Sequence, residues 1–344
     1  MCWKCYKSAA EFCFQERALT HHAHMYKDNP RDLYGQISDL LKLYPKPRNE
    51  EVRTIIVPNN AIRYSAEIAA QAYAQICPTN LKRIFVIAPH EQFVANKFLL
   101  TSCDCISTPS YNIAVDSQVN EELYKTGGCE FVSRVDDEKN LGVEIQLPFI
   151  TKIMEEHKGK FRIVPIYVGF IEFKNISWFA MKLMPYFKSK ENLFIFSLSL
   201  THWGSIYGYT EIKESKPTIL DSIKEHDLCA IEALKTLNFK AFDLQICLAK
   251  TPLPEFYLWG IFLKLAQTLF EEEEHRCRKL PDAEFSKAYQ EIGQLQVHGL
   301  AWSLPDLTKD RSSISFASLS LRRFFKKCWE DPLKPNSEKD KSCP

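Results

Sequence analysis

His202 is the histidine of this chain that is best placed for chemistry. It follows the run 193–200, which consists mostly of Leu, Ile and Phe and comes after a charged segment at 188–191. Such a run is typical of a strand that is buried on both faces in a parallel sheet. Ligands of open α/β sheets bind at the carboxyl ends of the strands, so His202 is a candidate site residue. The alternative is a histidine that only forms a hydrogen bond within a packed loop.

Polar side chains follow two other predicted strands. Asn59 comes after the strand 52–57 and Pro58, while His90 and Glu91 come after the strand 83–88 and Pro89. A helix over about 65–76 is predicted between the two strands, which gives a βαβ unit with its loops on one edge of the sheet.

Hydrolytic chemistry is a further possibility near His202. Ser197 and Ser199 precede the histidine, but the strained G-x-S-x-G turn that exposes a nucleophilic serine is absent from the sequence. We therefore do not favour a serine hydrolase. Cys103 and Cys105 are interpreted as buried structural cysteines.

The rest of the pattern predicts one compact α/β domain, with a mostly parallel central sheet flanked by helices. Further helices are expected at 32–44, 117–125, 143–157, 176–187, 221–237 and 257–274. Further strands are expected at 161–168 and, as a late and antiparallel pair, at 294–302 and 312–319.

Both ends of the chain are predicted to lie outside this domain, which spans 17–321. The arm 1–16 contains three cysteines, and three histidines follow it; the residues are Cys2, Cys5, Cys13, His21, His22 and His24. They could hold zinc, but a second ligand pair at the usual spacing is missing, so a frayed arm is favoured. The tail 322–344 is predicted to be largely disordered.

Composition narrows the classes of partner. The chain has 344 residues, a net charge of +1 and 45% hydrophobic residues, which is ordinary for a soluble globular protein and suggests neither a nucleic-acid partner nor membrane insertion. The first residues lack the apolar core of a secretory signal, and the twelve cysteines are then expected to be reduced thiols. The expected location is the cytoplasm, with the nucleus as a further possibility.

Several segments, in one consistent order from 17 to 321, resemble motifs of the Memo family (mediator of cell motility). Residues 17–26 resemble R-E-A-S-H-A-G-S-W-Y, residues 55–62 resemble I-I-A-P-H-A-G-Y, and residues 83–91 resemble R-I-F-I-L-G-P-S-H. Residues 141–148 are similar to H-S-I-E-M-H-L-P, residues 197–204 to S-S-D-F-C-H-W-G, and residues 311–317 to D-S-S-V-S-Y-A.

This resemblance implies a fold like that of the class III extradiol dioxygenases, which use non-haem iron. It also implies a pocket of histidines, an aspartate and a cysteine that binds copper or iron, with a redox role. Finally, it implies an adaptor role in motility signalling, through phosphotyrosine segments of a receptor.

The departures from the family pattern fall on the pocket. Glu91 stands where the family has the first histidine of P-S-H-H, and the segment 254–260, which lines up with C-G-R-H-P-I-G, contains no cysteine. His202 is kept, as is His21 in the first motif. The other pocket histidines and the aspartate are replaced, at Asn59, Leu141, Gln146 and Ser199.

Non-haem Fe(II) requires two imidazoles and a carboxylate on one face. The substitutions remove that set, and a carboxylate-rich site of Glu91, Glu255 and His202, or one that uses His90, is the alternative for a metal. The prediction is therefore a protein without a cofactor that works as a binding or scaffold module, with a metal-dependent enzyme as the rival function. The candidate ligand-binding residues are His21, Asn59, Glu91, Gln146, Ser199 and His202.

Overall fold

A computed structural model describes residues 15–20, 25–27, 29–44, 52–90, 92–278, 294–304 and 307–322. The cysteines of the arm, His21, His22, His24, Glu91 and the tail beyond 322 lie outside these residues, so the predictions that concern them stay predictions. Residue 16, the last of the predicted arm, lies in a short strand, β1 (Glu16–Arg17).

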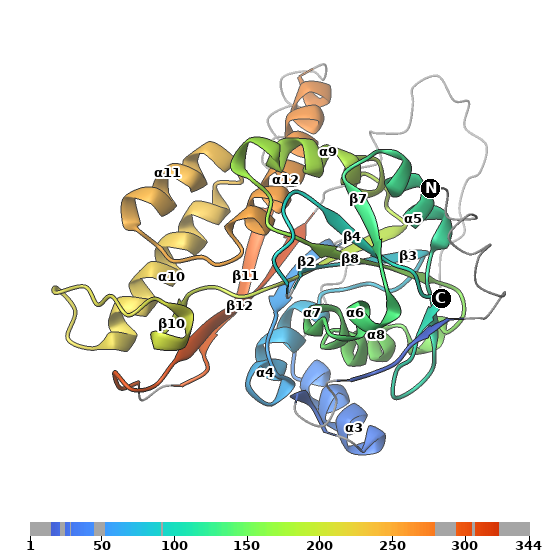
Figure 1. Cartoon of the computed structure of the whole chain (residues 1–344), viewed down its shortest axis with the longest axis horizontal. Helices are drawn as coiled ribbons and strands as arrows, with labels where there is room; N and C mark the ends of the chain where they lie inside the picture. Colours follow the sequence, from blue (N-terminus) through green and yellow to red (C-terminus); the bar gives the residue numbers. More distant parts are fainter. Residues whose placement is uncertain are drawn as a thin grey trace.

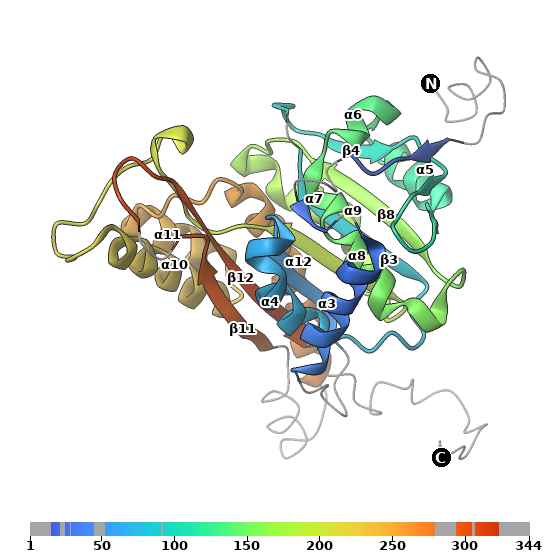
Figure 2. The same cartoon turned by 90° about the horizontal axis from the view of Figure 1, so that it is seen from below.

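Four parallel strands form the centre of the main sheet, in the order β2 (Val52–Pro58), β9 (Asn192–Leu198), β3 (Arg83–Pro89) and β8 (Arg162–Val168). Every residue of β2 and β9 is buried. Their mostly apolar and β-branched sequences fit this burial, because helices cover both faces of the sheet (Figures 1 and 2).

Antiparallel pairings extend the sheet at both sides and make it mixed. On one side β8 pairs with β4 (Phe98–Thr101), which pairs in parallel with β7 (Cys129–Val132). On the other side β2 pairs with β12 (Ser313–Arg322), which also pairs with β11 (Gln294–Trp302) and β10 (His202–Trp203). The predicted late antiparallel pair is thus confirmed. A separate small sheet consists of β1, β5 (Cys105–Ile106) and β6 (Ile113–Ala114).

Alternate residues of the central strands feed two cores. Phe85 and Phe194 face a core with α9 (Ile176–Phe187), α10 (Ile219–Lys235), α11 (Phe239–Ala249) and α12 (Phe256–Cys277). Their neighbours Ile84 and Ile195 face the opposite core, with α3 (Pro30–Lys42), α4 (Ile62–Tyr73), α7 (Leu141–Glu144) and α8 (Leu147–Ile153). The α/β class and the single compact domain are confirmed, and no described helix is long and apolar enough to cross a membrane.

The helix predicted at 143–157 is wrong as one continuous element. The chain instead forms α7, then α8, then a short 3₁₀ turn at Glu155–His157. Pro148 lies in the first turn of α8, where its missing N–H costs no helical hydrogen bond, whereas within a continuous helix it would. The break places Gln146 at the start of α8 rather than inside a helix.

Candidate functional site

The loops that follow β2 and β9 meet at the carboxyl edge of the sheet. The backbone N–H of Asn59 donates to the carbonyl of Leu198 at 3.2 Å, and the hydroxyl of Ser199 donates to the carbonyl of Asn59 at 3.3 Å. Parallel strands bring their carboxyl ends to one edge, as the sequence predicts. Asn59 and Ser199 therefore share one site.

Gln146 reaches this edge from α8 but uses its amide to hold the scaffold. Its Nε2 donates to the carbonyl of Pro58 at 2.9 Å and to the hydroxyl of Ser197 at 2.8 Å, while its Oε1 accepts from the hydroxyl of Tyr73 at 2.9 Å. The side chain is 1% exposed. Both amide hydrogens are thus occupied, and only one lone pair of Oε1 is left for a ligand.

Helix α7 packs against the side chain of Asn59. A methyl group at Gly142 would come within 3.3 Å of Asn59 Oδ1 and 2.6 Å of the Ala88 side chain, so only glycine allows this approach. Asn59 Oδ1 is buried and has no hydrogen-bond partner among the described residues.

The backbone of His202 is fixed by strand pairing, while its imidazole ring leaves one nitrogen without a hydrogen bond to a described residue. Its strand β10 pairs with β12, where His202 lies opposite Ile314, and its ring centroid is 4.9 Å from that of Tyr207. Nε2 is buried without a partner among the described residues. Burial lowers the pKa of His202 to about 4, so the imidazole is neutral at neutral pH.

Glu255 enters the same region from the loop before α12. Glu255 is 7% exposed, and the backbone N–H of Ser199 donates to its carboxyl group. Its Oε2 is buried and has no partner among the described residues. Burial raises the pKa of Glu255 to about 8, so its carboxyl group is largely protonated at neutral pH. The structure therefore brings Glu255 to Ser199 in an uncharged form. The rival metal hypothesis requires Glu255 beside Glu91 and His202, and it stays a prediction because Glu91 lies outside the described residues.

The described donors do not fit a non-haem iron or copper centre. His202 supplies one imidazole and Glu255 one buried carboxyl, whereas the iron site needs two imidazoles and a carboxylate. The side chain of His90 is turned to its own loop, with Nδ1 2.9 Å from the carbonyl of Gln92. Within the part of the chain that the structure describes, no three His, Cys, Asp or Glu side chains form a group that could hold a metal ion.

Exposed aromatic rings lie near this edge. Phe93, 80% exposed, follows the end of β3 and stacks on Phe170 with ring centroids 5.9 Å apart. Phe170 in turn meets Tyr257, two residues beyond Glu255, at 5.8 Å. Exposed apolar groups of this kind are typical of protein interaction surfaces.

A buried charged network lies behind the site, and the sequence did not indicate it. Arg17 Nε lies 2.6 Å from Asp137 Oδ1, and its Nη1 lies 3.2 Å from Glu144 Oε2; all three side chains are 0% exposed. Tyr167 also donates to Asp137, and Tyr26 donates to Glu144 at 3.3 Å. The network ties β1 to α6 (Arg134–Glu138) and α7, the helix that packs against Asn59.

Replacing Glu255 by glutamine should stabilise the protein at pH 8 by about 2 kcal/mol. Each unit by which the folded pKa exceeds the unfolded pKa corresponds to about 1.4 kcal/mol, and the burial of the polar glutamine side chain offsets part of this gain. The folded pKa of about 8 lies above the ordinary 4.5, so the unfolded chain releases this proton first. Stability is therefore lost as the pH rises from about 4.5 to 8. Urea unfolding at pH 5 and pH 8 measures the effect.

Glu156→Gln is the matched control, because Glu156 is exposed. The control should follow the parent at both pH values. Equal stability of parent and Glu255→Gln at pH 8 would show that the Glu255 carboxyl ionises normally in the folded protein.

Comparison with known proteins gives consistent matches. The profile of one protein family, described as "Memo-like protein", matches residues 17–274. Protein MEMO1 of Homo sapiens is 30% identical over 227 residues, which cover 66% of this chain and 76% of the relative. Protein MEMO1 of Xenopus laevis is 29% identical over 301 residues, which cover 82% of this chain and 98% of the relative. Protein memo-1 homolog of Caenorhabditis elegans is 30% identical over 228 residues, which cover 66% of this chain and 64% of the relative.

Proposed function

The chain belongs to the Memo family, and on that premise we propose that it is a non-catalytic binding protein. It would hold a protein partner at the carboxyl edge of its parallel strands, around Asn59, Ser199 and His202, with Glu91 and His21 as further contacts. As the family resemblance implies, it would act in signalling linked to cell motility, in the cytoplasm, with the nucleus as a further location.

The observation that carries the proposal is the hydrogen bonding of the Gln146 side chain. At a position where the family motif has a histidine, this chain has an amide whose two hydrogens cross-link Pro58 and Ser197. A side chain used in this way stabilises the strand ends, and it replaces a strong imidazole ligand with an amide that keeps only one free lone pair. The protonated carboxyl group of Glu255 supports the same reading, because metal ions bind carboxylates in their deprotonated form. The neutral imidazole of His202 does not count against a metal, since this is the form of histidine that binds metal ions.

The exposed rings of Phe93 and Phe170, together with the half-buried Tyr257, support a protein as the ligand. Interfaces are enriched in aromatic side chains, which bury a large area at a low entropic cost. We propose a phosphotyrosine segment as the partner, whose ring would pack against Phe93 and Phe170.

The test compares phosphotyrosine peptides with their unphosphorylated forms, titrated into the full chain. Phe93→Ser should weaken binding by at least about tenfold, because hot-spot aromatics contribute about 2 kcal/mol or more. Leu248→Ser is the matched control, since Leu248 is 73% exposed on α11. Failure of every peptide to bind, or equal loss in the two variants, would contradict the proposal.

A second candidate function is a metal-dependent redox or dioxygenase-like enzyme with an altered ligand set. One observation favours it: His202 Nε2 and Glu255 Oε2 are both buried without a partner among the described residues. With Glu91 they would supply one imidazole and two carboxylates. The metal measurement that closes the Discussion separates the two functions.

A further inference from the structure

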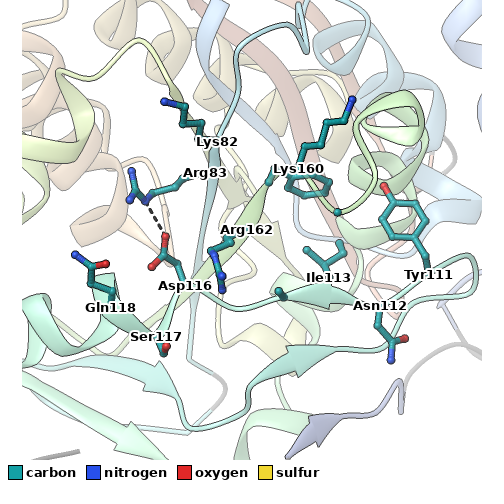
Figure 3. Close-up of a pocket in the computed structure, with 13 residues that line it drawn as sticks. Lys82, Arg83, Tyr111, Asn112, Ile113, Asp116, Ser117, Gln118, Lys160 and Arg162 are labelled. Atoms are coloured by element: carbon teal, nitrogen blue, oxygen red, sulfur yellow. Dashed lines mark hydrogen bonds and ion pairs between the residues drawn. The ribbon is translucent and has the colours of Figure 1, made fainter.

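A second candidate ligand site lies at the opposite edge of the sheet, where β3 and β8 begin. Arg83 and Arg162 are the first residues of these strands and are partners in the register. Beside them lies a cleft of about 570 Å³ (Figure 3). Because β3 and β8 are parallel, their amino ends are at the edge away from Asn59 and Ser199. The cleft is therefore separate from the candidate site described above.

The floor of the cleft is buried and held in place. Tyr111, Ile113 and Phe161 are each at most 8% exposed, and the hydroxyl of Tyr111 donates to the carbonyl of Thr151 at 3.1 Å. The amine of Lys158 lies 5.2 Å from the centroid of the Tyr111 ring. A fixed apolar floor with polar walls is the usual form of a small-molecule site.

The only carboxylate among the cleft's lining residues is already paired. Asp116 Oδ2 lies 2.7 Å from Arg83 Nε, and Asp116 Oδ1 accepts from the backbone N–H of Val119. Figure 3 shows Arg83, Asp116 and Arg162 grouped at one side of the cleft, with Tyr111 and Asn112 at the other. The carboxylate of Asp116 therefore neutralises the charge of Arg83.

The remaining basic residues of the lining carry excess positive charge. Lys82 is paired with Glu191 at 2.5 Å. Arg162 donates from Nη1 to the carbonyl of Val115 at 3.3 Å, and neither Arg162 nor Lys160 forms an ion pair with any described carboxylate. Arg162 and Lys160 thus line one cleft without an ion pair to a described carboxylate.

We propose that this cleft binds a small phosphorylated organic molecule that carries at least two negative charges. Arg162 presents the planar fork that matches phosphate oxygens, and Lys160 adds a point charge. Ser117, which also lines the cleft, offers a hydrogen bond to a hydroxyl or amide group of the organic part. Asn112 and Gln118 line the cleft as well and keep one amide hydrogen each, because their amides already donate to Glu16 and Glu122. The cleft volume lies within the range of about 300–1,000 Å³ that small-molecule pockets occupy, which favours a small ligand over a peptide.

The test titrates inorganic pyrophosphate, and separately ADP, into the full chain at about 0.15 M salt, where long-range surface attraction is screened. Both probes should bind saturably. The double variant Lys160→Ala, Arg162→Ala should weaken binding by at least about tenfold, because charge-assisted hydrogen bonds contribute about 1.5–3 kcal/mol each. Both residues are exposed, so the variant should unfold at the same urea concentration as the parent.

The matched control removes the same charge elsewhere, in the double variant Lys174→Ala, Lys235→Ala, which should bind both probes as the parent does. Absence of saturable binding, or equal weakening in the two double variants, would overturn the proposal. Binding of a polyglutamate peptide in the cleft without binding of pyrophosphate or ADP would also overturn it, in favour of a macromolecular partner. None of these outcomes depends on the peptide titrations at the other edge.

Discussion

Arg17→Met should lower the free energy of unfolding by about 3–5 kcal/mol, because it leaves two buried carboxylates without their positive counter-charge. Asp137 and Glu144 are both 0% exposed, and each loses its ion pair with the guanidinium. The carbonyls of Asp137 and Asn140 lose hydrogen bonds from Arg17 Nη2 as well. Urea unfolding at pH 7 measures the effect.

Lys139→Ala is the control for this prediction, because Lys139 is 53% exposed and pairs with Asp136 at the surface. Its effect should stay within about 0.5 kcal/mol. Adding Asp137→Asn and Glu144→Gln to Arg17→Met should recover part of the loss, since neutral side chains are cheaper to bury than unpaired charges. A loss below about 1 kcal/mol in Arg17→Met would mean that water or another cation reaches the two carboxylates.

Gln146→Leu should destabilise the protein by about 2–4 kcal/mol, because a buried polar group left without a partner costs about 1–3 kcal/mol. The leucine has a similar volume but leaves the carbonyl of Pro58 and the hydroxyls of Ser197 and Tyr73 without their bonds to the amide. Thermal or urea unfolding of the purified variant measures the loss.

Gln118→Leu removes the same amide from the exposed surface of α5 (Ser117–Lys125) and should change stability by less than about 0.5 kcal/mol. If Gln146→Leu were as mild as this control, the amide would not be cross-linking the strand ends. Its place in the pocket would then have to be explained by a ligand.

The helices and buried strands were largely predictable because the hydrophobic pattern of each lies within one short segment of the sequence. The helices at 117–125 and 176–187 have the predicted bounds, and the buried runs of β2 and β9 read as strands. The helix α11 was missed because its apolar residues do not mark one face: Phe242 and Ile246 are buried, but Leu244 and Leu248 are exposed.

The candidate site was predictable only where strand ends decide the geometry. Asn59 and Ser199 follow neighbouring parallel strands and meet as expected. The role of Gln146 depends on Tyr73 and Ser197, which are 73 and 51 residues away, and the bond of Arg17 to Asp137 spans 120 residues. A pattern within one segment carries no information on such pairs, so a buried arginine and a cross-linking glutamine look like ordinary polar residues in the sequence.

The metal content of the full chain, purified without an affinity tag or chelator and measured by mass spectrometry, tests the loss of the metal centre most directly. We expect far less than one metal ion per chain, and no stable uptake of added Fe(II), Cu(II) or Mn(II). His202→Ala and the control His275→Ala, at an exposed position on α12, should then behave like the parent. A nearly stoichiometric metal that disappears in His202→Ala but stays in His275→Ala would contradict the binding-protein account and establish a metal site at His202.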